Sequence, residues 1–191
     1  MPFRVLVSLA LASLAFPAAG AQDDWSTLTP GLGGSVQLAD RFGPEWTAGA
    51  GAGARAVLPA YGGVARASLD ARRYAAARPE LPDFRATTAT LGWGPTLALP
   101  AGARLSGGVL VGALHLRFER LEEIRFQNVT EIEAAVGGWG RLDVPLAGRL
   151  GVWLEADVLR VALSDPAALA TGSAGLALRL DTPGWLREVL R

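Results

Sequence analysis

Pairs of acidic residues stand two positions apart in this chain, within segments rich in apolar residues. Glu131 and Glu133 form one such pair, and Glu155 and Asp157 form another. Side chains alternate between the two faces of an extended strand, so both carboxylates of a pair share one face. Carboxylates in this arrangement can pair with arginines, hold a cation or act as a general acid and base. Because Ca²⁺ takes about six to eight oxygen ligands, two carboxylates alone do not predict a metal site.

His115 is the single histidine, so a hydrolase of the Ser-His-acid type would have to use it. Ser106 or Ser68 would then be the nucleophile, and Glu119 or Glu133 would orient the imidazole. Neither serine lies in the G-x-S-x-G motif that exposes the nucleophile in many hydrolases. We therefore expect no catalytic residues and no cofactor, with a lipid-modifying hydrolase as the enzymatic alternative.

The charged positions belong to segments in which apolar residues recur with a period of two. Between Trp46 and Leu58 every even position is apolar, while the odd positions hold Thr, Gly, Arg and Val. This alternation predicts strands with one apolar face and one polar face. An apolar exterior around a polar interior is typical of membrane barrels. The polar face of the predicted strands carries twelve charged residues: Arg55, Arg66, Asp70, Arg72, Glu131, Glu133, Arg141, Asp143, Glu155, Asp157, Arg179 and Asp181.

These charges comprise five arginines and seven carboxylates, so they nearly balance in sign. The interior of a barrel of about eight strands is just wide enough for side chains to fill, and unpaired buried charges are costly. We therefore expect a network of ion pairs that plugs the lumen, together with Trp139 and Trp153. The inward glycines Gly49, Gly51 and Gly53 would leave room for the long side chains.

Short turns with proline alternate with longer polar connections along the chain. The turns at Pro59, Pro100 and Pro145 recur about 40 residues apart, the length of one hairpin with its connections. Short turns at one rim and longer loops at the other are typical of outer-membrane barrels. The expected fold is all-β, a closed antiparallel up-and-down transmembrane barrel of about eight strands. The expected strands are residues 28–39, 46–58, 63–74, 84–99, 103–119, 128–144, 149–163 and 170–181.

The alternation changes phase within the fifth predicted strand. Apolar residues occupy odd positions up to Val111 and even positions from Leu114. A β-bulge near Gly112 would restore one outward apolar face, because a bulge inserts one extra residue into a strand. Phe42 and Trp46 are expected in an aromatic girdle at the outer rim.

The two ends of the chain differ from the barrel in composition. Residues 1–21 combine Arg4, an apolar run and a small-residue ending, which predicts a secretory signal peptide cleaved before Gln22. The barrel is then expected at residues 22–182 and a short C-terminal tail at residues 183–191, too short for a stable free helix. The absence of cysteine excludes disulfides, thiolate metal sites and a lipoprotein anchor.

Residues 173–180 read Ser-Ala-Gly-Leu-Ala-Leu-Arg-Leu, a polar residue and a glycine followed by alternating apolar residues. With the strand pattern and the proline turns, this segment resembles the small outer-membrane barrels of the OmpA and OmpX type over the whole mature chain. Ser173, Gly175, Leu178 and Leu180 match the insertion signal in the last strand of that family. The family signal commonly ends the chain in an aromatic residue, whereas a tail follows here. The resemblance implies a monomer in the bacterial outer membrane, with outer-membrane lipids and the barrel-assembly machinery as partners.

The expected function is a structural or surface-binding role in the outer membrane, without catalysis. A narrow channel for small solutes or ions is one alternative, and a soluble exported barrel resembling a lipocalin, with a small apolar ligand, is another. Removal of Arg4 with the signal peptide leaves 17 arginines against 18 acidic residues, so we expect no nucleic-acid partner.

Overall fold

The computed structural model describes residues 27–39, 42, 44–119, 130–162 and 167–189. The expected signal peptide lies outside these residues, so its cleavage stays a prediction. None of the described helices is long and apolar enough to cross a membrane. The strands are β1 (Thr27–Ala39), β2 (Trp46–Ala60), β3 (Gly63–Ala76), β4 (Phe84–Gly94), β5 (Thr96–Ala98), β6 (Arg104–Phe118), β7 (Thr130–Pro145), β8 (Leu150–Val161), β9 (Ala167–Leu178) and β10 (Leu180–Asp181).

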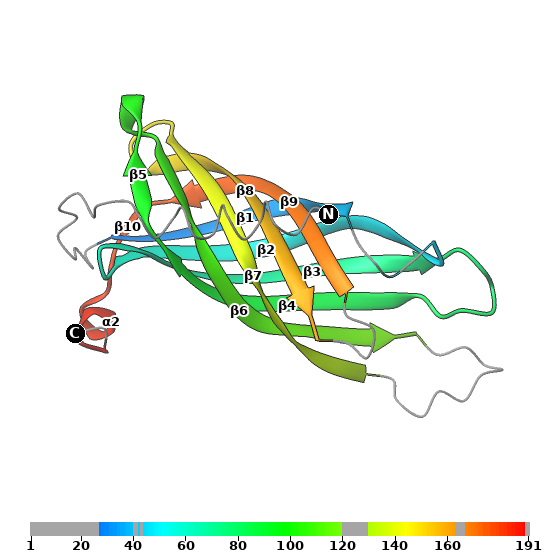
Figure 1. Cartoon of the computed structure of the whole chain (residues 1–191). Coiled ribbons are helices and arrows are strands. Elements are labelled where there is room, and N and C mark those ends of the chain that lie inside the picture. Colours follow the sequence, from blue (N-terminus) through cyan, green and yellow to red (C-terminus); the bar gives the residue numbers. More distant parts are fainter. Residues whose placement is uncertain (1–26, 40–41, 43, 120–129, 163–166, 190–191) are drawn as a thin grey trace, which may run out of the picture.

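The strands form one antiparallel sheet that closes on itself (Figure 1). Each long strand pairs with the next long strand along the chain, and β1 pairs with both β2 and β9. The short β5 continues β4 beyond Pro95 and pairs with β6, while β10 continues β9 and pairs with β1. The structure is therefore the expected closed barrel of eight strands, two of them interrupted.

Tight turns join the strands at one rim. Tyr61 and Gly62, between β2 and β3, have φ values of 49° and 70°. Such left-handed values in a two-residue connection match the right-handed twist of a hairpin. Ala101 and Gly102 also have positive φ, in the 3-10 turn Pro100–Gly102 that precedes β6. We call this rim the short-turn end and the opposite rim the long-loop end.

The outward face of the wall is apolar, and the inward face carries the charged residues. Leu32 and Ile132 are 72% exposed, although both are large apolar residues. Arg66 and Arg141 are 2% and 1% exposed, although both carry a charge. This arrangement is inverted relative to a soluble barrel and is the one that a lipid environment requires.

The phase change in the fifth predicted strand has a different cause from the expected one. β6 pairs with β4 and with β7 in unbroken register, so the expected bulge near Gly112 is wrong. Leu114 and Leu116 point inward and are buried, while His115 and Arg117 lie on the outward face. The pattern changes because toward the long-loop end the lumen becomes apolar and the outer wall becomes polar.

A register shift occurs instead in β2, between Ala48 and Gly51. One extra residue reverses the alternation, because side chains alternate with a period of two. Trp46 and Ala48, expected on the outward face, pack against the buried apolar residues of the lumen. Gly49, expected inward, is exposed.

Aromatic side chains fill the lumen at the long-loop end. Phe84 stacks on Tyr74 at 4.6 Å between ring centroids, and Phe42 meets both rings edge-on at 5.1 and 5.3 Å. Trp46 and Phe118 contact Phe84 at 5.7 and 5.4 Å. We call these five residues the aromatic cluster. Phe42 and Trp46 therefore close the lumen, and their expected place in an outer girdle is wrong.

The tail forms a short helix, α2 (Gly184–Val189), beside the short-turn end (Figure 1). The backbone N–H groups of Leu186 and Arg187 donate to the Pro183 carbonyl. The Arg187 guanidinium also donates to the Thr182 carbonyl at 3.0 Å. These bonds fix a segment that the sequence argument expected to be too short for a free helix.

Candidate functional site in the lumen

Three arginines from three strands converge on the carboxylate of Glu155. Arg55 Nε donates to Oε1 at 2.7 Å, and Arg66 donates to Oε1 at 2.6 Å and to Oε2 at 3.0 Å. Arg141 Nη1 reaches Oε2 at 3.5 Å. All four side chains are fully buried. Glu155 on β8 thus links β2, β3 and β7 across the interior of the barrel.

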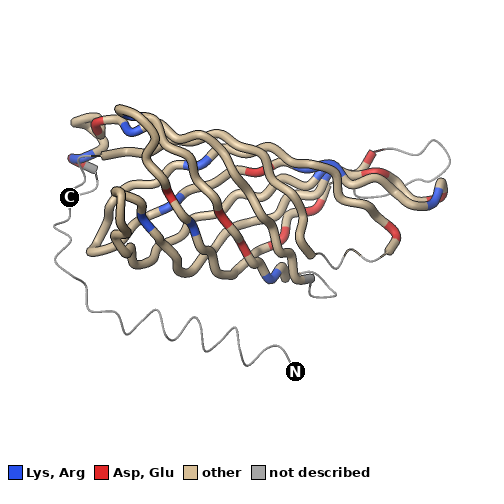
Figure 2. Tube along the Cα trace, turned by 90° about the horizontal axis from the view of Figure 1, so that it is seen from above, with Lys and Arg blue, Asp and Glu red and all other residues tan. Residues whose placement is uncertain are grey.

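Each of these arginines also holds a carboxylate of its own. Arg55 pairs with Asp70 at 2.8 Å, Arg66 with Asp157 at 2.7 Å, and Arg141 with Asp143 at 2.8 Å. We call these seven residues the lumen network, and Figure 2 shows charged residues on several strands along the middle of the barrel. The cost of removing charges from water is offset only when such pairs are well formed and further hydrogen bonds satisfy them.

Two tryptophans lie against the arginines of the network. The guanidinium carbons of Arg55 and Arg141 lie 5.3 and 4.9 Å from the ring centroid of Trp153. The guanidinium carbon of Arg66 lies 5.5 Å from the ring centroid of Trp139. Cations at these distances are attracted by the ring quadrupole, and the attraction is strongest where water is excluded. The expected contribution of both tryptophans to the plug agrees with this placement.

Glycines of β1 and β9 make space for the Trp153 indole. A Cβ built on Gly31 would lie 2.7 Å from Trp153 Nε1, and one on Gly33 would lie 2.6 Å from Cζ2. A Cβ on Gly175 would lie 2.7 Å from Cζ2 and would overlap the Leu32 carbonyl. Gly175 thus has a packing role in the lumen, separate from the insertion signal that the sequence predicts.

Replacement of Gly175 with alanine should lower the free energy of unfolding by about 1–3 kcal/mol, because the added methyl group forces Trp153 or the β1 backbone to move. Gly140→Ala is the matched control, since a Cβ there would meet no atom within 4 Å. Urea unfolding in detergent micelles, followed by tryptophan fluorescence, measures both variants. Equal stability of the two variants would contradict the packing role.

Polar partners that the sequence argument missed complete the site. Ser173 Oγ accepts from Arg55 Nη2 at 3.2 Å, and Thr90 Oγ1 accepts from Arg66 Nη1 at 3.2 Å. Arg72 donates to Ser35 Oγ at 2.9 Å and to Gln37. The only sign of these partners in the sequence is the hydroxyl residues at alternate strand positions. A hydroxyl side chain is tolerated on either face of a strand, so its residue type alone does not predict that it points inward.

The remaining predicted charges lie away from the network. Glu131 is exposed and Glu133 half-buried at the long-loop end, and no ion pair joins either to another described residue. Asp181 is exposed at the short-turn end, where it faces Arg149 at 3.4 Å. Arg179 is half-buried at the same end. The structure thus joins seven of the twelve residues by ion pairs and places Arg72 beside them.

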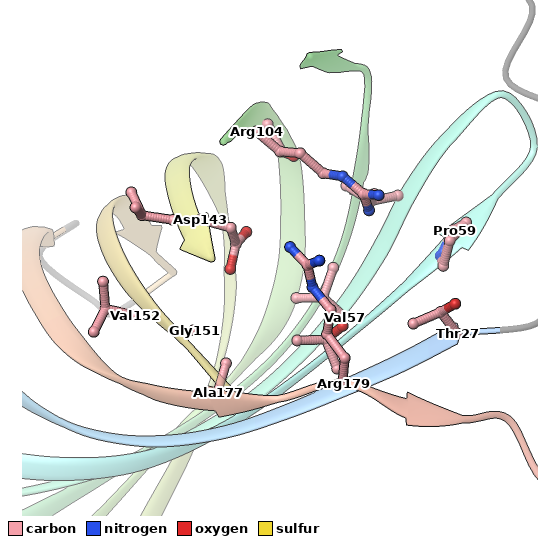
Figure 3. Close-up of a pocket in the computed structure, with 13 residues that line it drawn as sticks. Thr27, Val57, Pro59, Arg104, Asp143, Gly151, Val152, Ala177 and Arg179 are labelled. Atoms are coloured by element: carbon pink, nitrogen blue, oxygen red, sulfur yellow. The ribbon is translucent and has the colours of Figure 1, made fainter. Parts of the chain in front are cut away.

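Two cavities lie on either side of the lumen network, and no residue lines both. The long-loop cavity contains Asp70 and Asp157, each with one buried carboxylate oxygen that has no hydrogen-bond partner. Arg72 and Thr88 line the same cavity. The short-turn cavity contains Arg104, Arg179 and Asp143 (Figure 3).

The residues weighed for a hydrolase do not come together. His115 lies on the outward face of β6, whereas Ser106 and Ser68 point inward and are buried. The wall of the barrel therefore separates the imidazole from both candidate nucleophiles. Within the described part of the chain, no group of three or more histidines, cysteines or carboxylates is arranged to hold a metal ion.

Solved β-barrel structures superimpose on more than 80% of this chain. Ail, the attachment invasion locus protein of Yersinia pestis, crystallised with the heparin analogue sucrose octasulfate, superimposes with a TM-score of 0.54 at 14% identity, over 81% of this chain and 99% of that chain. Neisserial surface protein A (NspA) gives a TM-score of 0.52 at 7% identity, over 82% and 96%. The chain has the fold of the small outer-membrane β-barrels.

A third match is the outer membrane protein Ail of Yersinia pestis in a phospholipid bilayer nanodisc, with a TM-score of 0.50 at 14% identity, over 81% and 99% of the two chains. No family model matches this barrel, and no curated protein sequence matches it. At these identities the likeness shows the fold alone.

Proposed function

We propose that this protein is a non-conducting barrel of the bacterial outer membrane that anchors its long connections at the cell surface. The apolar outward face and the fold shared with outer-membrane barrels support the location. β1 begins and β10 ends at the short-turn end, so the short turns would face the periplasm and the long connections the exterior. The role is then structural or surface-binding, and no catalytic step is part of it.

The observation that carries the proposal is the double closure of the lumen. The lumen network, with Trp139 and Trp153, fills the middle of the barrel with buried side chains. The aromatic cluster and the buried Leu114 fill it again toward the long-loop end. A solute would have to pass both layers, which argues against the narrow channel. The charged middle layer also argues against a lipocalin-like site, since an apolar ligand needs an apolar interior.

The long connections carry more acidic than basic residues, unlike a surface that binds polyanions. Residues 40–45, 77–83, 119–129 and 162–166 contain eight acidic residues and four arginines. The heparin analogue bound by Ail is strongly anionic, and repulsion by these acidic residues would oppose it. We therefore expect a basic partner, if the long connections bind one.

Planar bilayer recording tests the closure. The mature protein, refolded and checked for heat-dependent gel migration, should give no unitary current steps at concentrations at which a general porin conducts. The physical reason is that buried ion pairs leave no continuous water path. Reproducible unitary steps from the folded protein would contradict the proposal and would favour the channel.

A further inference from the structure

The short-turn cavity brings together two arginines that the rest of the barrel leaves without a counter-ion. Arg104 at the start of β6 and Arg179 between β9 and β10 both line it. Figure 3 shows both guanidinium groups extending from facing walls into the space between them. Among the described residues, neither group has an ion-pair partner.

The carboxylates around this cavity are already committed to other arginines. Asp143 lines the cavity, but both of its oxygens accept from Arg141 Nε, at 3.0 and 2.9 Å. Asp181 at the rim faces Arg149 at 3.4 Å. The cavity therefore keeps an excess of positive charge at Arg104 and Arg179.

The inner end of the cavity is closed, so its arginines do not line a continuous path through the barrel. Arg141 lies behind Asp143 and is fully buried, and Trp153 is 1% exposed beside it. The walls add the hydroxyl of Thr29 and that of Ser106, which already shares a hydrogen bond with Thr96. The geometry is a blind pocket, open at the short-turn end, with two planar donor groups directed into it.

We propose that the short-turn cavity binds a small oxyanion, a carboxylate or a phosphate, between Arg104 and Arg179. Guanidinium groups present parallel N–H donors that match the oxygens of such anions, and charge-assisted bonds of this kind are the strong ones. Arg104 is exposed and Arg179 is half-buried, so a ligand can reach both groups, and the partial enclosure of Arg179 by the barrel wall lowers solvent screening there. The site takes its ligand from the side of the membrane that the short turns face.

Isothermal titration of the mature protein in zwitterionic micelles tests the site, with inorganic phosphate and glutarate as separate probes and chloride at matched ionic strength as the reference. We expect saturable binding of at least one probe, and the stronger probe distinguishes a phosphate site from a carboxylate site. Arg104→Gln and Arg179→Gln should each weaken it about tenfold or more. Arg85→Gln, an exposed arginine on the outward wall, is the matched control and should leave binding unchanged.

Three outcomes with the wild-type protein and the arginine variants would overturn the proposal. They are no saturable binding by the folded wild-type protein, binding that both pocket variants retain, and equal loss in Arg85→Gln. The chain's own Asp23 and Asp24 precede β1 in sequence, so the titration is repeated in D23N/D24N. Binding that appears only in that variant would show that Asp23 and Asp24 pair with the two arginines in the wild-type protein. That outcome would also contradict the proposal that the cavity binds an external ligand. Heat-dependent gel migration confirms that every variant is folded.

Discussion

Replacement of Glu155 with glutamine is expected to lower the free energy of unfolding by about 3–5 kcal/mol, because it breaks a buried ion pair from one side. Glu155 accepts hydrogen bonds from Arg55, Arg66 and Arg141, and all of these side chains are fully buried. Without the carboxylate, Asp70, Asp157 and Asp143 would each still hold one arginine, but the buried N–H donors of three strands would lose the charged acceptor that links them.

Glu131→Gln is the control for this variant. Glu131 is at an inward position of β7, as Glu155 is in β8, but its side chain is exposed. Its replacement should therefore change the free energy of unfolding by about 0.5 kcal/mol or less. Urea unfolding in lipid vesicles, followed by tryptophan fluorescence, reads both variants on one scale. If Glu155→Gln cost no more than Glu131→Gln, the central carboxylate would not hold the lumen network together.

Much of the barrel follows from the two-residue period of the sequence. In β3, Arg66, Asp70 and Arg72 alternate with Ala65, Ala67, Leu69 and Ala71, and only one face of that strand can tolerate lipid. The same argument places Glu155 and Asp157 inward on β8. Pairing among these residues could be expected in general, since buried charges need partners. The central position of Glu155 could not be predicted, because the register of three strands decides which arginines reach its carboxylate.

The two-residue period does not predict the orientation of side chains where the environment on both faces changes along a strand. At the long-loop end the inward side chains are Tyr74, Phe84 and Leu116, so apolar residues there no longer indicate lipid. The outward side carries Arg73, Arg85 and Arg117, which stand side by side in register across β3, β4 and β6. At that level a pattern of apolar and polar residues does not tell the inward face from the outward face, and the predicted bulge near Gly112 is absent.

The bulge in β2 cannot be predicted from the residues that surround it. Residues 48–54 alternate strictly between alanine and glycine, and both residues are small enough to fit either face. No side chain in this run therefore opposes a one-residue shift. The shift is visible only from the partner strand, where Arg72 and Tyr74 fix the register on either side of it.

Two adjacent positions in β4 test the inside and outside of the wall directly. Ala89 is exposed on the outward face, midway along the strand, whereas Thr88 points inward and lines the long-loop cavity. Ala89→Lys should destabilise the inserted barrel by about 2–4 kcal/mol, the cost of a lysine at the bilayer midplane. Thr88→Lys should cost about 1 kcal/mol or less, because charge-assisted hydrogen bonds to nearby carboxylates offset the burial.

The contrast between the two lysines depends on the acceptors inside the cavity. Thr88 is the cross-strand partner of Asp70, and one buried oxygen of Asp70 and one of Asp157 have no hydrogen-bond partner. An ammonium group at position 88 therefore gains two acceptors, whereas at position 89 it meets lipid chains. Urea titration of folding into vesicles measures both variants. Equal costs at the two positions, or a greater cost at Thr88, would mean that the outward face of β4 does not contact lipid.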